Sequence, residues 1–138
     1  MTRINLIPVE ELSDQHLIAE YKELPRCIKQ DINILDAPRI YTLGKGHMKW
    51  ARRNWHFLLN RFSLICSEMD YRGFKRKYSA KDLYDYFHSH YKFEKIIYIP
   101  SSVDLKISRD RIKEKLFLKP DFYKWTNRTK PDYININK

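Results

Sequence analysis

An amphipathic stretch near the start of the chain, residues 13–28, constrains the fold more than any other feature of the sequence. At 100° per residue, its side chains divide between two faces of a helix. The polar face, with His16 at its edge, consists of Gln15, Ala19, Lys22, Glu23 and Arg26. The apolar face consists of Leu17, Ile18, Tyr21, Leu24 and Ile28. Because Ser13 or Asp14 can cap the first turn, the stretch predicts a helix with one side in a core and a charged side outward.

Two further stretches show the same periodicity. A second helix over about residues 48–69 is expected to bury Trp55, Leu58, Leu59, Phe62, Ile65 and Cys66. A capping-box sequence at residues 101–104 predicts a third helix over about 102–119, with Arg111 and Lys115 on its outward face. With only three glycines and no low-complexity linker, the chain is predicted to be all-α. We expect one compact domain, residues 1–138, with three main helices joined by loops.

The remaining segments are less regular. Residues 82–91 predict a short helix, whereas the apolar stretch 95–99 fits either a strand or a buried extended segment. Residues 122–128 form a C-terminal tail that mixes aromatic rings with cations. Its rings suit stacking on nucleic-acid bases or packing over the helical core, and different rings can do each.

The charge balance indicates the kind of partner. Lys and Arg total 27 against 17 for Asp and Glu, a formal net charge of +10, which is typical of proteins that bind nucleic acid. Cys27 and Cys66 lie in apolar surroundings and do not form the pattern of a disulfide framework or a zinc site. The sequence contains no membrane-spanning run and no signal-peptide layout. We therefore expect a soluble, cytoplasmic protein.

The first residues suggest an unusual nucleophile. A small residue at position 2 favours removal of Met1, which would leave Thr2 with a free α-amine. That amine titrates near neutrality, so roughly 10–20% of it is uncharged at pH 7. An uncharged amine beside a carboxylate on a basic protein indicates imine chemistry on DNA.

Several motifs resemble one family of DNA-repair enzymes. They are Thr2-Arg3-Ile4-Asn5-Leu6, the block from Asp14 to Arg26, and the Gly44-x-Gly46-His47 loop, with Tyr98-Ile99-Pro100, Arg111-x-x-x-Lys115 and Pro120-x-x-Tyr123-Lys124 further on. Together they are similar to the pyrimidine-dimer DNA glycosylases of phages and algal viruses, also called dimer-specific endonuclease V. The resemblance implies a compact all-α enzyme that binds duplex DNA at a cyclobutane pyrimidine dimer from the minor-groove side and kinks it. It also implies that the adenine opposite the 5′ base of the dimer is flipped into a pocket on the protein.

The resemblance also assigns chemistry. The Thr2 α-amine would attack C1′ of the 5′ nucleotide of the dimer, expel the base and form an imine, after which β-elimination cuts the strand. Glu23 matches the catalytic carboxylate of the family. From periodicity alone, Glu23 would be a solvated helix carboxylate paired with Lys22 or Arg26.

The other matched positions imply contacts with DNA: Arg3, Gln15, Lys22, Arg26, Arg111 and Lys115. Lys22 departs from the family, which usually has arginine there. Lysine keeps the charge but loses the planar, two-pronged hydrogen bonding to phosphate. We therefore expect activity with an altered affinity.

Two alternatives remain open beside this hypothesis. The protein could be a lyase of abasic sites without dimer specificity, or a basic DNA-binding module without catalysis. In each case we expect a monomer. We also expect no cofactor and no metal, because the amine mechanism needs none and His88-Ser89-His90 lacks accompanying ligands.

Overall fold

The structure is a computed structural model, which describes residues 4–29, 35–90 and 96–132, and no strand occurs in these ranges. Their helices are a short 3-10 helix, η1 (Val9–Glu11), and α1 (Asp14–Lys29), α2 (His47–Arg53), α3 (Trp55–Arg72), α4 (Ala80–His90) and α5 (Ser102–Leu118). The prediction of an all-α protein is therefore confirmed. The prediction of three main helices is corrected, because the described residues form five α-helices.

The first predicted helix is confirmed as α1. Ser13 Oγ accepts a hydrogen bond from the backbone N–H of His16 at 3.1 Å, as an N-cap residue does. Leu17, Leu24 and Ile28 on its apolar face are fully buried. At the other end of α1, the buried guanidinium of Arg52 donates to the carbonyl of Ile28 at 2.7 Å, satisfying an acceptor that the helix itself leaves open.

The second predicted helix is two helices, α2 and α3, divided at Asn54. The backbone N–H of Asn54 and its side-chain Nδ2 both donate to the carbonyl of Trp50, at 3.1 and 2.9 Å. An asparagine that bonds its neighbouring backbone in this way competes with helix continuation. The expected apolar face of α3 is buried throughout, including Leu58, Phe62 and Ile65.

The later part of the chain follows the prediction with one correction. The short helix expected at residues 82–91 is α4, and the capping box formed by Ser101 and Asp104 begins α5 as predicted. Residues 96–100 form neither a strand nor a buried segment, because Ile97 and Ile99 are 75% and 81% exposed. Lys95 lies outside the described residues. No helix in the described ranges is long and apolar enough to cross a membrane.

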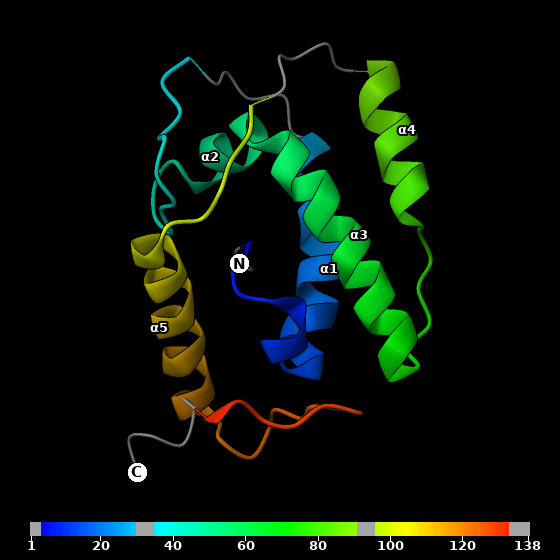
Figure 1. Cartoon of the computed structure of the whole chain (residues 1–138), viewed down its shortest axis with the longest axis vertical. Helices are drawn as coiled ribbons and strands as arrows, with labels where there is room; N and C mark the ends of the chain where they lie inside the picture. Colours follow the sequence, from blue (N-terminus) through cyan, green and yellow to red (C-terminus); the bar gives the residue numbers. More distant parts are fainter. Residues whose placement is uncertain (1–3, 30–34, 91–95, 133–138) are drawn as a thin grey trace.

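The helices are arranged around α1 and α3. Helix α3 packs against α1 and α4, and α5 lies on the opposite side of the molecule from α4 (Figure 1). The extended segment Ile4–Ile7 lies between α1 and α5, where Asn5 bonds to Glu20 of α1 and Leu6 bonds to Ser108 of α5 (Figure 1). The start of the described chain is therefore part of the interior.

A buried ion pair joins α1 to α3 at this point. Glu20 and Arg61 are 0% and 4% exposed, and Arg61 donates to both carboxylate oxygens of Glu20. Because two charges taken out of water lose strong hydration, such a pair persists only when its hydrogen-bonding groups find partners. Here Glu20 also accepts from the backbone and side chain of Asn5, at 3.1 and 2.8 Å. Arg61 also donates to the carbonyl of Ile7 at 2.8 Å.

Replacing Arg61 with methionine should therefore destabilise the fold strongly. The Glu20 carboxylate would be left buried without its cation, which costs about 3–5 kcal/mol. Urea unfolding of Arg61→Met against the parent protein measures this cost. Lys81→Met is the control, since Lys81 and Asp85 form an exposed ion pair, with side chains 82% and 55% exposed; its unfolding curve should not shift. Equal curves for the parent and Arg61→Met would contradict the prediction.

Candidate active site and nucleic-acid interface

The segment Ile4–Ile7 is held by side chains from four parts of the chain. The contacts are Ile4 N to His47 Nε2 (3.1 Å), Ile4 O to Tyr41 Oη, Asn5 N to Glu20 Oε1 (3.1 Å), Leu6 N to Ser108 Oγ (3.0 Å) and Ile7 O to Arg61 Nη1 (2.8 Å). The backbone that begins two residues after the predicted nucleophile is therefore fixed in place. Thr2 and Arg3 themselves lie outside the described residues.

Three predicted site residues share the outward face of α1. Lys22 and Arg26 are exposed, and Glu23 between them is half-buried. Glu23 Oε2 lies 4.0 Å from Arg26 Nη1, and the two side chains are 16% and 77% exposed. A pair this long, with its cation in solvent, is weak. The Glu23 carboxylate is thus partly shielded from water, while the exposed Arg26 guanidinium remains available to bind an anion.

A cavity of about 470 Å³ opens beside this face, between α1, α3 and α4. Its lining combines aromatic rings with cations and consists of Tyr21, Lys22, Pro25, Arg26, Lys29, Phe62, Tyr78, Asp82, Leu83 and Tyr86. The rings of Tyr21 and Phe62 stack at 5.5 Å, and Lys29 Nζ lies 4.3 Å from the centroid of the Tyr86 ring. Tyr21 and Phe62 are themselves buried, so it is the half-exposed ring of Tyr78, together with the cations of this lining, that suits a planar ring with a phosphate nearby.

The predicted cations of α5 act on the beginning of α1. Burial, and then the charges of Arg111 and Lys115, lower the pKa of His16 to about 4. Arg111 and Lys115 of α5 are therefore close enough to His16 for their charges to act on its ring. His16 is therefore a neutral side chain at pH 7, stacked on the ring of Tyr123 at 4.7 Å.

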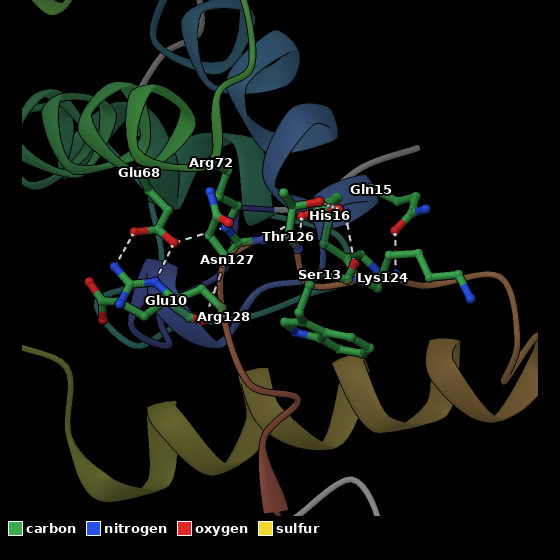
Figure 2. Close-up of polar contacts among 12 residues, drawn as sticks. Glu10, Ser13, Gln15, His16, Glu68, Arg72, Lys124, Thr126, Asn127 and Arg128 are labelled. Carbon is green, nitrogen blue, oxygen red and sulfur yellow. Dashed lines mark hydrogen bonds and ion pairs between the residues drawn. The ribbon is translucent and has the colours of Figure 1, made fainter.

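The C-terminal tail is fastened to the same end of α1 (Figure 2). Gln15 uses both ends of its amide here, donating to the carbonyl of Phe122 at 2.9 Å and accepting from the N–H of Lys124 at 3.1 Å. Trp125 Nε1 donates to the carbonyl of Glu11 at 3.0 Å. Packing over the core thus describes Tyr123 and Trp125, while Phe122 is 54% exposed.

A second network of charged side chains binds the tail to α3 and α1. Arg128 and Arg72 both donate to the carboxylate of Glu68, Arg128 at 2.8 and 2.9 Å and Arg72 at 2.8 Å (Figure 2). Arg72 also donates to Asp14 at 3.0 Å, and Asp14 accepts from the hydroxyl of Thr126 at 2.6 Å. The tail, α3 and the first residue of α1 are therefore joined through four charged side chains.

A model of the family described as pyrimidine dimer DNA glycosylase matches residues 1–82. The chain belongs to this family. The matched part of the glycosylase runs from the start of the chain into α4 and includes Gln15, Lys22, Glu23 and Arg26. Arg111, Lys115 and the tail lie beyond it.

The structure adds residues that the sequence analysis did not single out. Glu20 and Arg61 were not predicted, although a signal for them exists. Glu20 follows Leu17 by three positions and precedes Leu24 by four, and Arg61 stands in the same relation to Leu58 and Ile65. A charged residue within an apolar face indicates burial with a partner. The sequence placed His47 in the Gly44-x-Gly46-His47 motif without assigning it a role, and in the structure it holds the backbone of Ile4.

Metal ligation finds no support in the geometry that is described. Within residues 4–29, 35–90 and 96–132, no three His, Cys, Asp or Glu side chains lie close enough together to hold a metal ion.

The lowered pKa of His16 predicts how stability changes with pH. In the unfolded chain His16 takes up a proton near pH 6.5, while in the folded glycosylase it does so near pH 4. Between these values the unfolded state binds more protons, so stability falls as the pH falls, by at most about 1.4 kcal/mol per pH unit. Urea unfolding between pH 7 and 4 should show this loss in the parent protein. His16→Phe, which keeps a ring against Tyr123, should lose less stability over that range; parallel curves would contradict the assignment.

Proposed function

We propose that the protein excises cyclobutane pyrimidine dimers from double-stranded DNA and then cleaves the strand at the resulting abasic site. In this proposal it acts as a cytoplasmic monomer, without metal or cofactor, and its nucleophile is the α-amine of Thr2 after Met1 is removed. One observation carries the proposal. Glu20 holds the backbone of Asn5, and Glu23 follows Glu20 by three residues on the same helix. The Cβ atoms of residues three apart on a helix lie about 5–6 Å from each other, which supports a position for Glu23 near the anchored segment.

Chain length limits where the amine can act. Two residues span at most about 7 Å, so the α-nitrogen of Thr2 works within that distance of the buried Ile4 nitrogen. A nucleophile confined in this way reaches C1′ of a bound nucleotide without a large loss of entropy at the moment of reaction.

The proposed chemistry has two stages, release of the base and cleavage of the strand. The uncharged amine attacks C1′ of the 5′ nucleotide of the dimer, a C1′–N bond forms to the protein, and the glycosidic bond breaks as the base leaves with the electron pair. Ring opening of the sugar gives a protonated imine, which acidifies the C2′ protons. Loss of one of them expels the 3′ phosphate and cuts the strand.

Glu23 is proposed to support both steps. Its partly shielded carboxylate would stabilise the positive charge that develops on the sugar, and it would then accept and deliver protons. The weak contact with Arg26 favours this role, since a carboxylate held tightly by a cation would be a poor base.

The cations around the site are proposed to bind the DNA backbone. Lys22 and Arg26 flank Glu23 on α1, and the electrostatic effect of Arg111 and Lys115 on His16 supports a role for these two cations of α5 near the start of the same helix. Arg3 and Gln15 are proposed contacts beside the lesion. The aromatic cavity next to Lys22 and Arg26 is proposed to receive the adenine that is flipped from opposite the dimer, because its walls offer stacking to a planar base.

Two other functions remain as alternatives. A lyase of abasic sites would share the amine and Glu23 but would not recognise the dimer. A non-catalytic DNA-binding module would use the cations alone. Family membership and the anchored N-terminal segment favour the glycosylase over both.

Reductive trapping tests the proposed function. The mature protein is mixed with a duplex that contains one cis-syn thymine dimer, borohydride is added, and a covalent protein–DNA band is expected. Blocking the α-amine should abolish the band, because no imine can form. Glu23→Gln should slow base release by about 10²–10⁴-fold while DNA binding persists.

The other outcomes distinguish the alternatives. A band on abasic DNA but none on dimer DNA would leave only the lyase. If neither substrate gives a band although Met1 is absent, the protein only binds DNA. Loss of activity on adding a chelator would contradict the metal-free mechanism.

The proposed role of Lys115 predicts a change in salt dependence. Lys115→Ala should weaken binding and reduce the slope of log K against log salt by about 0.9, the value for one lost phosphate contact. Lys106→Ala removes the same charge from α5, but Lys106 is half a turn away from Lys115 around the helix and pairs with Asp110 at 2.6 Å. This control should keep the parent slope. Equal slopes for both variants would show that α5 contributes only general charge.

A further inference from the structure

The backbone of Ile4 is held at both its N–H and its carbonyl by one segment of the chain. Its N–H donates to His47 Nε2 at 3.1 Å, and its carbonyl accepts from the hydroxyl of Tyr41. The backbone of Asn5, Leu6 and Ile7 bonds instead to α1, α5 and α3. Residues 41–47 therefore hold Ile4, the first described residue after Thr2 along the chain.

His47 is set in the one tautomer that can accept from Ile4. Its Nδ1 lies 2.7 Å from the carbonyl of Thr42, and a carbonyl oxygen can only accept. Nδ1 therefore carries the hydrogen and Nε2 presents a lone pair to the Ile4 N–H. Burial raises the pKa of Tyr41 well above its usual range, so its hydroxyl remains a donor.

The two side chains are themselves fixed. Tyr41 and His47 are each 1% exposed, and both pack against Trp50, with ring centroids 4.9 and 5.7 Å away. Gly46, immediately before His47, has φ = 101°, a conformation that side chains other than glycine rarely adopt. A Cβ there would also lie 3.0 Å from Pro38 Cγ.

We propose that Tyr41 and His47 are positioning residues for the reaction: they hold the backbone of Ile4 and so confine the α-amine of Thr2 to the reach of two residues from this fixed point. The inference rests on the proposed function, since it requires the amine to be the nucleophile. A fixed attachment point limits the positions that the amine explores, and a displacement of 1 Å at a reacting group can cost about 10²-fold in rate. Both residues act through backbone, so their loss should slow imine formation without weakening DNA binding.

A buried peptide needs hydrogen-bond partners whatever precedes it, so the test uses a readout that stability alone does not change. Tyr41→Phe keeps the ring and removes only the hydroxyl. Tyr98→Phe is the matched control, because Tyr98 also contacts Trp50, at 5.4 Å, and its hydroxyl donates to Asp104 at 2.6 Å and not to Ile4. For each variant we would measure the melting temperature, the Kd for duplex DNA, and the single-turnover rate of borohydride trapping at saturating protein.

Tyr41→Phe should trap about 10- to 100-fold more slowly than the parent on both dimer and abasic duplexes, with its Kd within twofold. Tyr98→Phe should trap at the parent rate. His47→Gln, which offers an amide oxygen in place of Nε2, should retain more of the rate than His47→Leu, and this pair decides the question if Tyr41→Phe does not fold.

Three results would overturn the inference. If the parent traps DNA and Tyr41→Phe traps it at the same saturated rate, the inference is wrong and the proposed function stands. If Tyr98→Phe loses as much rate as Tyr41→Phe, the effect is general destabilisation. If the parent traps neither substrate, the proposed function fails and the inference fails with it.

Discussion

The ion pair between Glu20 and Arg61 is the interaction on which the rest of the structure depends. Neither charge can remain in the interior alone, and the pair still leaves hydrogen-bonding groups to satisfy. The segment Ile4–Ile7 supplies them through Asn5 and the carbonyl of Ile7. The charged centre of the core thus determines where the beginning of the chain lies, and that beginning in turn separates α1 from α5.

A second polar network, where the tail meets α1 and α3, likewise needs a distant segment to complete its hydrogen bonds. Asp14, Glu68 and Arg72 are buried, and the tail supplies Thr126 and Arg128 to complete their bonding. Both ends of the described chain are therefore tied to α1 and α3 by charged groups rather than by apolar packing alone. Such bonding is directional, which fixes the position of the groups it joins more closely than an apolar contact does.

Local sequence patterns predicted the features that depend on neighbouring residues alone. The faces of α1 and the capping box of α5 follow from periodicity and from side chains that bond to neighbouring backbone. The division at Asn54 was missed because a single side-chain hydrogen bond overrides the periodicity of residues 48–69. The exposure of Ile97 and Ile99 was missed because an apolar run does not say which element will cover it.

The site was predictable only in part for a related reason. The resemblance pointed to Glu23, Lys22 and Arg26, and the structure brings these three together on α1. The roles of Glu20, His47 and Tyr41 depend on pairings between segments distant in sequence, which no single helix pattern contains. The aromatic cavity likewise is lined by residues of α1, α3 and α4, so it depends on how these helices pack.

The bond from Leu6 to Ser108 spans 102 residues, and this separation has a consequence for synthesis on the ribosome. The ribosome synthesises residues 4–7 long before α5, so through most of elongation Leu6 has no Ser108 to bond. Contacts so distant in sequence form late and slowly. A chain that ended after α4 would contain all the residues that match the family, 1–82, but it would lack α5, which covers one side of the segment Ile4–Ile7. The segment Ile4–Ile7 therefore completes its hydrogen bonds only after α5 has been synthesised.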